Sequence, residues 1–357
     1  MARALQLARK AIGKTSPNPM VGAVIVKSGK VVGEGYHKQA GQAHAEIEAI
    51  KKAGRSARGA ELFVNLEPCC HHGKTPPCVD AILSAGLKKI YIGMTDPNKL
   101  VDRRGISILR KHGIEVEVGI LKEECERLNE SFAKFIRTGI PFVIMKSGIS
   151  LDGKIATSSG ESQWITCEKS RKLVHEIRGT VDAILVGSGT VLKDDPRLTV
   201  RLYNRKFNNP VRVILDGRSR VKVKARVFEN AGKDRVIYVT SPKLSKRKEK
   251  RLCDLGVDVL KLPGGDKSFK LKMLLEELGQ RNIVNVLLEG GGLLNASALK
   301  ENVVDKALLF IAPIIIGGEN APGFIGGKGF KKLKDAARLK KVEAKKIGDD
   351  FMIEGYF

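Results

Sequence analysis

The sequence predicts an α/β protein made of two domains. Apolar, β-branched segments of strand length alternate along the whole chain with segments whose apolar residues recur at helical spacing. The chain has 357 residues, whereas a single hydrophobic core rarely grows beyond roughly 250–300 residues. A helix stop and a proline meet at Gly139-Ile140-Pro141. We therefore predict one domain at residues 1–141 and a second at residues 142–357.

The first half begins with an apolar-periodic helix over about residues 2–13. Two β-branched runs follow, Val21–Val26 and Val31–Gly35, and Ser28-Gly29 between them predicts a hairpin. The next elements, in chain order, are a helix from His44 to Gly54, a strand at Leu62–Leu66, a helix from Cys78 to Gly86, a strand at Lys89–Gly93, a helix near 103–112, a strand at 114–118 and one helix around 122–137. This order is typical of a sheet covered by helices.

The second half opens with the apolar segment PFVIMKSGIS, which predicts its first strand. A helix at Glu168–Arg178 and a strand at Ala183–Val186 come next. Five further strands are predicted, at Val211–Leu215, Val236–Thr240, Val257–Leu260, Val284–Leu288 and Ala307–Ile311. The second domain is therefore also expected to be α/β.

The composition favours a soluble globular protein. Hydrophobic residues make up 42% of the chain and charged residues 29%, and no apolar run approaches the roughly 18 residues of a membrane span. The first residues, MARALQLARKAIGK, carry charges throughout, and no apolar segment with a cleavage site follows them. We expect a cytoplasmic protein that is not secreted and does not bind a membrane.

The formal charge of +25 is dispersed over both halves. The densest basic run, KLSKRKEKR at 243–251, fits one solvated face of a helix. A positive field suits anionic phosphate substrates as well as nucleic acid, and charged surfaces are also common in proteins from hot environments. Because charge alone is an unspecific signal, we expect a phosphorylated small molecule and no nucleic acid as the partner.

His44-Ala45-Glu46 and the downstream segment Pro68–Cys78 form the sharpest chemical motif. Zinc deaminases use one His and two Cys ligands, keep a fourth position open for water and place nearby a carboxylate that does not bind the metal. The common pattern spaces its cysteines as C-x-x-C, whereas eight residues separate Cys69 from Cys78 here. The motif therefore predicts a zinc deaminase of a branch with an insert between its cysteines.

Two alternatives to this assignment stay open. A structural zinc site would need a fourth protein ligand, for which the sequence offers Cys70, His71 and His72. The second alternative is Cys70 as the ligand in place of Cys69. The three scattered cysteines are expected to be ordinary buried residues: Cys125, Cys167 and Cys253.

The second half carries a glycine run, EGGGLLN at Glu289–Asn295, directly after an apolar strand and before a helical pattern. Glycines there let backbone N–H groups approach a phosphate, and the helix N-terminus adds a favourable dipole. Gly187-Ser188-Gly189 also follows a strand, but Leu192 stands where a Rossmann fingerprint needs its third glycine. The run at 289–295 is therefore the better candidate for a pyrophosphate-binding loop.

HAE, EPCCHHGKTPPC and TSPNPMVGAVIV in the first half, with FVIMKSGISLDGKIA and GESQWIT in the second, resemble the bifunctional riboflavin-biosynthesis deaminase/reductase family. The resemblance continues to the C-terminus. It implies a cytidine-deaminase-like αβα sandwich followed by a dihydrofolate-reductase-like α/β domain. The implied substrate is a diaminohydroxy-pyrimidinone with a ribosylamino 5′-phosphate, which loses its 2-amino group as ammonia and then has its ribosyl group reduced by NADPH to a ribityl chain.

The resemblance also implies roles for residues of the first domain. One zinc ion would be held by His44, Cys69 and Cys78, and Glu46 would take a proton from water and return it to the ring nitrogen and the leaving amine. The implied substrate contacts are Asn18 and His37 at the base, Lys74 at the phosphate, and the matching loop residues Asp96 and Asn98. The same loop departs from the family pattern at Lys99, Asp102 and Arg103, where small residues and a proline are usual.

In the second domain, the resemblance implies NADPH contacts at Gly148, Trp164, Thr190, Asp194, Gly291, Gly292, Leu293, Leu294 and Asn295. The implied substrate contacts are Ser162, Arg178, Leu198, Arg201 and Glu289. Lys146 and Asp194 are candidates to assist proton transfer. Ordinary roles compete at three positions, as a core or interface anchor for Trp164, a strand-end lysine for Lys146 and a helix C-terminal charge for Arg178.

Two other functions compete with the bifunctional enzyme. A nucleic-acid-editing zinc deaminase would account for the zinc motif and the charge, but it leaves the second domain unexplained. A non-catalytic zinc-binding regulatory protein is the other alternative, and the intact Glu46 argues against it. We also expect the protein to be a homo-oligomer.

Overall fold

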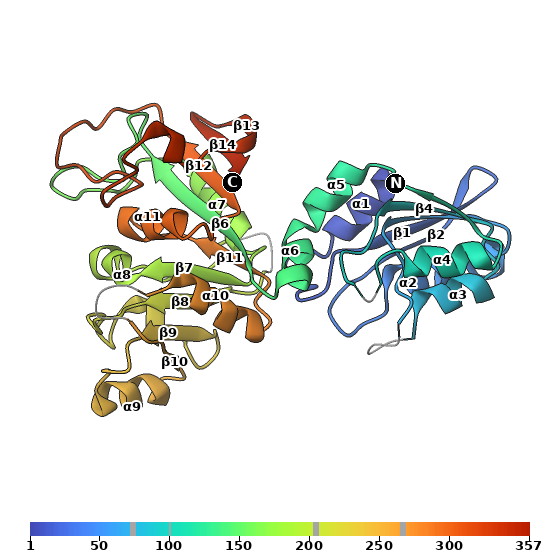
Figure 1. Cartoon of the computed structure of the whole chain (residues 1–357), viewed down its shortest axis with the longest axis horizontal. Coiled ribbons are helices and arrows are strands. Elements are labelled where there is room, and N and C mark those ends of the chain that lie inside the picture. Colours follow the sequence, from blue (N-terminus) through green and yellow to red (C-terminus); the bar gives the residue numbers. More distant parts are fainter. Residues whose placement is uncertain (72–75, 100, 203–206, 265–268) are drawn as a thin grey trace. The chain divides into compact units, whose positions relative to one another are not determined.

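The computed structural model describes residues 1–71, 76–99, 101–202, 207–264 and 269–357. The chain forms two compact units, Met1–Ile140 and Pro141–Phe357 (Figure 1). In the described part of the chain, no helix is both long enough and apolar enough to cross a membrane.

The first unit is built on a five-stranded sheet with the order β2-β1-β3-β4-β5. Its strands are β1 (Gly22–Lys27), β2 (Lys30–Tyr36), β3 (Glu61–Leu66), β4 (Lys89–Met94) and β5 (Glu115–Val118). β1 pairs antiparallel with β2 and β3, and β3, β4 and β5 run parallel. The predicted hairpin is confirmed, and both turn residues, Ser28 and Gly29, have the positive φ that a tight hairpin turn requires (48° and 74°).

Helices cover both faces of this sheet (Figure 1). The helices of the unit are α1 (Ala2–Arg9), α2 (Ala45–Ala53), α3 (Cys78–Ser84), α4 (Arg104–Lys111), α5 (Lys122–Leu128) and α6 (Glu130–Thr138), with a 3-10 turn, η1, at Gly54–Ala57. α2 packs directly on β2, because a Cβ at Gly35 would lie only 2.2 Å from the carbonyl oxygen of Ala45. The glycine thus fixes the depth at which α2, with Glu46 in its first turn, sits on the sheet.

The single helix predicted around 122–137 is wrong, because the structure divides it into α5 and α6 at Asn129. Asn129 has φ −112° and ψ 20°, outside the helical range. Its buried side chain accepts a hydrogen bond from the Met20 N–H (2.8 Å) and donates one to the Met20 carbonyl (3.0 Å). The hydrogen bonds between Asn129 and Met20, 109 positions apart, interrupt the helix, and no local sequence pattern predicts this interruption.

The second unit is built on a nine-stranded sheet with the order β10-β9-β8-β7-β11-β6-β12-β14-β13. Its strands are β6 (Phe142–Ile149), β7 (Ala183–Gly187), β8 (Val211–Leu215), β9 (Val236–Thr240), β10 (Asp258–Lys261), β11 (Asn285–Leu288), β12 (Lys306–Ile311), β13 (Lys340–Ile347) and β14 (Asp350–Tyr356). Neighbours from β10 to β12 run parallel, and β14 and β13 add an antiparallel edge. The predicted strands are confirmed, β8 and β9 at the predicted bounds.

The helices of the second unit are α7 (Glu168–Arg178), α8 (Ser188–Asp194), α9 (Lys246–Asp254), α10 (Leu271–Gln280) and α11 (Gly292–Lys300), with 3-10 turns η2 (Arg226–Phe228) and η3 (Leu333–Asp335). α7 has the predicted bounds, and α11 begins within the glycine run, as expected for a loop that leads into a helix. The expectation for the scattered cysteines is correct for buried Cys125 only, since Cys167 is half-buried and Cys253 is exposed. Cys253 lies on the basic helix α9, which packs through Leu252.

Candidate active sites

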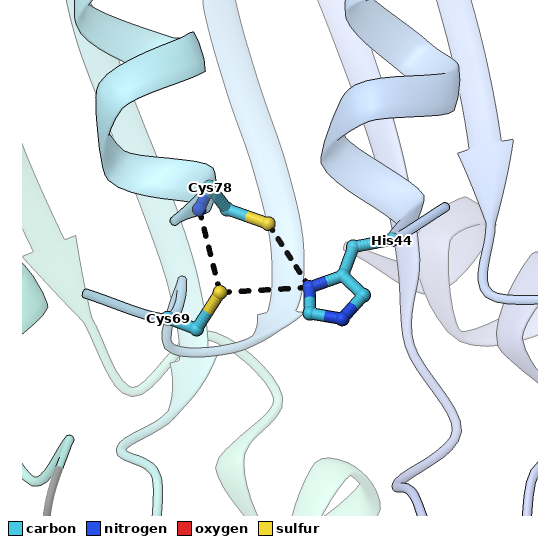
Figure 2. Close-up of side chains that lie close together, drawn as sticks. All are labelled: His44, Cys69 and Cys78. Atoms are coloured by element: carbon cyan, nitrogen blue, oxygen red, sulfur yellow. Dashed lines mark hydrogen bonds between the residues drawn. The ribbon is translucent and has the colours of Figure 1, made fainter. Parts of the chain in front are cut away.

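His44, Cys69 and Cys78 meet at one point of the first unit (Figure 2). His44 is the residue just before α2, Cys69 follows β3, and Cys78 is the first residue of α3. The His44 Nδ1 atom lies 3.1 Å from the Cys78 Sγ atom and 3.5 Å from the Cys69 Sγ atom, and the Cys78 backbone N–H donates to Cys69 Sγ at 3.3 Å. One imidazole nitrogen and two sulfurs therefore lie within 4.8 Å of one another.

This donor set fits zinc, and the described residues supply three ligands to it. Hydrogen bonds from Cys78 and His44 lower the pKa of the Cys69 thiol to about 4, so it is ready to act as a thiolate ligand. Among the described residues, no fourth histidine, cysteine or carboxylate joins the cluster. Cys70 packs half-buried against the apolar core, His71 is exposed, and His72, the third candidate for a fourth ligand, lies outside the described residues. Three protein ligands with an open fourth position are typical of a catalytic zinc site.

Glu46 lies beside this cluster, in the first turn of α2. Its side chain is buried (3% exposed), and its Oε2 atom has no hydrogen-bond partner among the described residues. Burial, reinforced by the negative charge of Cys69, raises the pKa of Glu46 to about 7. A carboxyl group with a free oxygen and such a pKa can both accept and donate a proton near neutral pH.

Asn18 and His37, the predicted contacts to the base, lie together next to the metal cluster. The Asn18 amide nitrogen is 3.1 Å from His37 Nε2, and His37 Nδ1 is 3.1 Å from the Ala43 carbonyl oxygen. Burial lowers the pKa of His37. Its ring meets the ring of His44 edge to face, with 5.4 Å between the centroids. These contacts bring a loop before β1 to the zinc ligands.

Asp96 and Asn98 lie on the loop that leads from β4 toward α4. Asp96 is buried, and its Oδ1 atom accepts a hydrogen bond from the Asn98 N–H at 2.9 Å. Burial chiefly raises the pKa of Asp96 to about 6, and the charges of Glu67 and Cys69 add to this effect. Lys74, the predicted phosphate contact, lies outside the described residues.

In the second unit, one pocket of about 940 Å³ is lined by seven of the predicted site residues. They are Lys146, Gly148, Ser162, Trp164, Arg178, Asp194 and Arg201. Trp164 is 66% exposed, and the Arg171 guanidinium lies 4.7 Å from the centre of its ring. The alternative of a core tryptophan is therefore wrong, because the ring faces the pocket and solvent.

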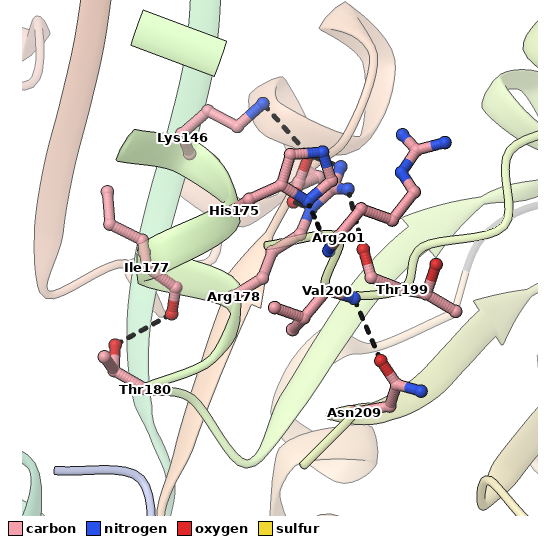
Figure 3. A network of polar contacts seen from close by, with 10 residues as sticks. Lys146, His175, Ile177, Arg178, Thr180, Thr199, Val200, Arg201 and Asn209 are labelled. Atoms are coloured by element: carbon pink, nitrogen blue, oxygen red, sulfur yellow. Dashed lines mark hydrogen bonds and ion pairs between the residues drawn. The ribbon is translucent and has the colours of Figure 1, made fainter. Parts of the chain in front are cut away.

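A buried ion-pair network lies at the edge of this pocket (Figure 3). Glu289 accepts two hydrogen bonds from Arg178, Nε to Oε1 at 2.6 Å and Nη2 to Oε2 at 2.9 Å, and its Oε2 atom is 2.9 Å from Lys146 Nζ. Although burial opposes the charge, these two cations hold the pKa of Glu289 well below its usual range. The network commits the paired N–H groups of Arg178 to Glu289.

The guanidinium of Arg201, unlike that of Arg178, is not paired with a carboxylate of the described residues. Its backbone N–H donates to His175 Nδ1 at 3.3 Å, and its guanidinium has no acceptor among the residues that the structure describes. Burial and the neighbouring arginines 178 and 201 lower the pKa of His175 to about 4, so His175 is neutral at pH 7. Figure 3 shows Lys146, His175, Arg178 and Arg201 gathered at one place.

A further pocket, of about 520 Å³, holds the other predicted cofactor residues: Thr190, Gly291, Gly292, Leu293 and Leu294. It is formed where α8 and α11 begin, so two helix N-termini border it. A Cβ at Gly189 would meet nothing within 4 Å, and one at Gly291 would meet only Thr190 Oγ1 at 3.8 Å. The backbone at both glycines is therefore open to a ligand.

Three predicted contact residues do not line either pocket with their side chains. Asn295 is buried and donates to Ser147 Oγ (3.2 Å) and to the Phe324 carbonyl (2.9 Å). Leu198 is buried in the apolar core, and Glu289 lies behind Lys146 and Arg178. The structure therefore does not support direct ligand contacts by these three side chains in either pocket.

The sequence reasoning did not single out four residues that the structure brings to these sites. They are Glu67 in the first unit and Arg171, His175 and Arg220 in the second. Arg220 lines the smaller pocket and donates to Ser188 Oγ at 2.9 Å. Only Glu67 carried a local signal, since it directly precedes Pro68-Cys69.

Both halves of the chain match known families. The cytidine and deoxycytidylate deaminase zinc-binding region matches residues 1–94, and the RibD C-terminal domain matches residues 141–353. The riboflavin biosynthesis protein RibD of Actinobacillus pleuropneumoniae is 44% identical over 355 residues, which cover 99% of this chain and 93% of that protein. The protein of the same name from Escherichia coli (strain K12) is 40% identical over 361 residues, covering 98% of this chain and 96% of the relative.

Solved structures resemble the whole chain as well. A diaminohydroxyphosphoribosylaminopyrimidine deaminase/5-amino-6-(5-phosphoribosylamino)uracil reductase from Thermotoga maritima has a TM-score of 0.88 and 39% identity, and the match covers 100% of this chain and 97% of that one. Acinetobacter baumannii RibD, in its form 1, has a TM-score of 0.88 and 37% identity over 99% of this chain and 97% of that one.

Proposed function

This chain belongs to the RibD family of bifunctional deaminase/reductases in riboflavin biosynthesis, and on that premise we propose the substrate, the cofactor and the residues of each reaction. The predicted fold classes are confirmed, with a cytidine-deaminase-like domain followed by a RibD reductase domain that is dihydrofolate-reductase-like. The family acts on a phosphorylated pyrimidine intermediate. The competing functions of nucleic-acid editing and non-catalytic zinc binding do not account for the match over residues 141–353.

The proposed substrate of the first reaction is 2,5-diamino-6-ribosylamino-4(3H)-pyrimidinone 5′-phosphate, and residues 1–141 carry out its deamination. Water adds to the ring carbon that bears the 2-amino group, and ammonia leaves. Glu46 accepts the proton of that water through its unpartnered oxygen and returns it to the ring nitrogen and the leaving amine. Asn18 and His37, beside the metal cluster, hold the base, and Asp96 and Asn98 border it from the loop after β4.

His44, Cys69 and Cys78 are the proposed ligands of one zinc ion per chain. When bound, zinc supplies the Lewis acid that makes a water molecule more acidic near neutral pH. The chain supplies the rest of the site: the hydrogen bond from the Cys78 N–H holds the Cys69 thiolate in place, and the first turn of α2 places Glu46 next to both sulfurs.

Residues 142–357 are the proposed reductase, with NADPH as the hydride donor. The smaller pocket would receive the phosphates of the cofactor at the N-terminus of α11, and Gly148, Trp164 and Asp194 in the larger pocket would meet its nicotinamide end. The bound cofactor supplies the hydride that passes to C1′ of the opened ribose. Lys146, held by Glu289 at 2.9 Å, or Asp194 would supply the accompanying proton.

Arg201 is the proposed reader of the substrate's 5′-phosphate in the reductase. Arginine can hold a phosphate through two parallel charge-assisted hydrogen bonds. The corresponding N–H groups of Arg178 already bond to Glu289, so Arg178 offers only its remaining hydrogens to the same pocket. Ser162 and Arg178 complete the proposed substrate wall, and Leu198 and Glu289 support it from behind. A homo-oligomer and a cytoplasmic location remain predictions.

One observation carries this proposal: the His44, Cys69 and Cys78 donor atoms converge beside a buried carboxylate with a free oxygen. The test is to incubate purified protein with zinc, the diaminopyrimidine nucleotide and NADPH, and to follow the products by mass spectrometry. We expect an oxygen in place of the released nitrogen first, and then the gain of a hydride and a proton. Reduction of the substrate with no release of ammonia would contradict the proposed first reaction.

A further inference from the structure

We propose that Glu67 is a positioning residue for the deamination, because its carboxylate ties the loop that carries Asp96 and Asn98 to the segment that carries Cys69. The inference rests on the proposed function and adds to it a residue that does not touch the metal cluster or the substrate. Glu67 acts through the loop, by setting where the loop stands relative to the zinc ligands.

Glu67 stands between the end of β3 and the first cysteine. Its backbone N–H donates to the Met94 carbonyl at 2.9 Å, so the chain there still follows the neighbouring strand β4. Only Pro68 separates Glu67 from Cys69, which fixes their relative position. The Glu67 side chain is 2% exposed and points away from water.

The carboxylate of Glu67 accepts three backbone hydrogen bonds from one distant segment. Its Oε2 atom accepts from the N–H of Asp96 (3.2 Å) and of Arg103 (3.0 Å), and its Oε1 atom accepts from the N–H of Ile106 (3.2 Å). Asp96 is near the start of the loop, Arg103 ends it, and Ile106 lies in the first turn of α4. One side chain therefore closes the loop and caps the helix that follows it.

The helix end explains why a carboxylate stands here. Within the described residues, no side chain of the segment itself caps α4, and Arg103 precedes the helix in the left-handed region with φ 60°. The free N–H groups of the first turn carry partial positive charge, which a carboxylate satisfies best. Glu67 supplies that carboxylate from 36 and 39 residues earlier in the chain.

Gly105 gives a second, independent sign that α4 is docked on this segment. A Cβ at Gly105 would lie 2.4 Å from the Pro68 carbonyl oxygen and 3.3 Å from Glu67 Oε1. The helix backbone therefore approaches the Glu67-Pro68 backbone so closely that only glycine fits. The loop, α4 and the cysteine segment behave as one packed block.

The hydrogen bonds to Glu67 anchor Asp96, near the start of the loop, and Arg103, at its end, to the same side chain. The Asn98 N–H donates to Asp96 Oδ1 at 2.9 Å. Without Glu67, the positions of these two residues would depend on the loop conformation alone. The loop sequence departs from the family pattern at Lys99, Asp102 and Arg103. A displacement of about 1 Å of a positioning group can cost on the order of a hundredfold in rate. Glu67 therefore fixes the position of Asp96 and Arg103 relative to Cys69.

The test compares Glu67→Gln with the control Glu61→Gln. Glu61 is the first residue of β3, the strand that ends just before Glu67; it is half-buried and pairs with Lys88 at 3.5 Å. A glutamine at 67 presents an NH2 group to at least one of the three N–H donors, so the loop must shift. We expect Glu67→Gln to keep zinc and the reduction of already deaminated substrate, to raise KM for deamination roughly tenfold, and to lower kcat/KM by about ten- to a hundredfold. Glu61→Gln should match wild type.

If Glu67 had a purely structural role, its substitution would change stability and leave the kinetic constants unchanged. If Glu67→Gln lowers only the melting temperature, while KM and kcat per zinc-loaded chain match those of wild type, the positioning role is overturned. Should Glu67→Gln fail to fold, Gly105→Ala decides the question, since it pushes α4 away from Pro68 and leaves the carboxylate in place. The same rise in KM is expected of Gly105→Ala, and an unchanged KM would overturn the proposal.

A double-mutant cycle separates this inference from the proposed function. If Glu67 acts through the loop, the effects of Glu67→Gln and Asn98→Ala on kcat/KM should not add, because the second change removes what the first displaces. Additive effects would overturn the coupling. An Asn98→Ala variant with wild-type kinetics would contradict the proposed substrate contact at Asn98, and the kinetics of Glu67→Gln would still decide whether Glu67 positions the site.

Discussion

The two units each bury a glutamate at their candidate site, and the two carboxyl groups differ in their partners. Glu46 is 3% exposed and has one oxygen with no partner among the described residues, and burial raises its pKa to about 7. The Glu289 side chain is 8% exposed, slightly more than that of Glu46, but Lys146 and Arg178 hold the pKa of Glu289 well below its usual range. The presence of cationic partners therefore decides whether a buried carboxyl can exchange a proton or serves as a fixed negative charge.

This difference matches the chemistry of the two proposed reactions. The site of the first unit is compact, with three donor atoms within 4.8 Å of one another, and in the proposed reaction the chain itself moves the proton. The reductase site is spread over pockets of about 940 and 520 Å³, because the cofactor would bring the reactive hydride and the chain must hold two large ligands.

The largest expected effect comes from removing a proposed zinc ligand of the first unit, which should leave the site of the second unit intact. Cys78→Ser should lower the zinc content from about one per chain to near zero and reduce deamination by more than about a hundredfold, since even changes behind a metal ligand cost 10–100-fold. Reduction of already deaminated substrate should continue. The measurement is metal analysis together with both half-reactions, and an unchanged zinc content would place the ligand elsewhere.

The next largest effect is expected when the buried negative charge of Glu289 is removed from the second unit. Glu289→Gln leaves Lys146 and Arg178 without their buried counter-charge, and breaking a buried ion pair in this way costs about 3–5 kcal/mol. Urea unfolding of the variant should show the second unit losing stability, while deamination by the folded first unit stays near wild type. Equal unfolding midpoints for variant and wild type would show that the network contributes little.

A smaller effect is expected at the phosphate. Arg201→Ala should raise KM for the phosphorylated substrate of the reductase by about ten- to a hundredfold, because position controls hydride transfer. NADPH binding and deamination should change little. Wild type should prefer the nucleotide over its dephosphorylated form, and the variant should lose most of that preference. A variant that discriminates as well as wild type would show that Arg201 does not read the phosphate.

The smallest effect is a pH dependence of stability in the second unit. The pKa of His175 falls from an ordinary 6.5 to about 4 in the folded chain, mainly through burial. Between these values the unfolded state binds more protons, so this residue makes stability increase as pH rises from about 4 to 6.5. The contribution should stay below about 1 kcal/mol, since solvent still reaches and screens the half-buried ring. Unfolding of His175→Asn across this range should show a flatter slope, and an identical slope would exclude His175 as its source.

The sequence predicted most strands of both sheets, because apolar, β-branched runs bounded by turn residues are local signals. It could not predict the break at Asn129, which depends on a contact with Met20 across 109 residues. The strands of the antiparallel edge, β13 and β14, were also missed. The residues of β13 are mostly exposed and charged and show no apolar alternation.

The candidate sites show the same difference between local sequence signals and contacts that are distant in sequence. His44, Glu46, Cys69 and Cys78 stand in two short motifs, so their chemistry can be inferred from spacing and residue type. The pairing of Arg178 with Glu289 spans 111 residues, and nothing near either residue indicates that the two N–H groups of the arginine are already engaged. Candidate residues at both sites could be named from the sequence, whereas Arg171, His175 and the partners of the buried charges became known only from the fold.

The most direct test of the account is a Glu46→Gln variant assayed for zinc, ammonia release and reduction of already deaminated substrate in one preparation. The substitution keeps the shape of the side chain and every proposed zinc ligand, and it removes the only group proposed to carry the proton. The account predicts about one zinc per chain, deamination lowered by roughly 10²–10⁴-fold and reduction near the wild-type rate. Ammonia release at the wild-type rate would contradict it.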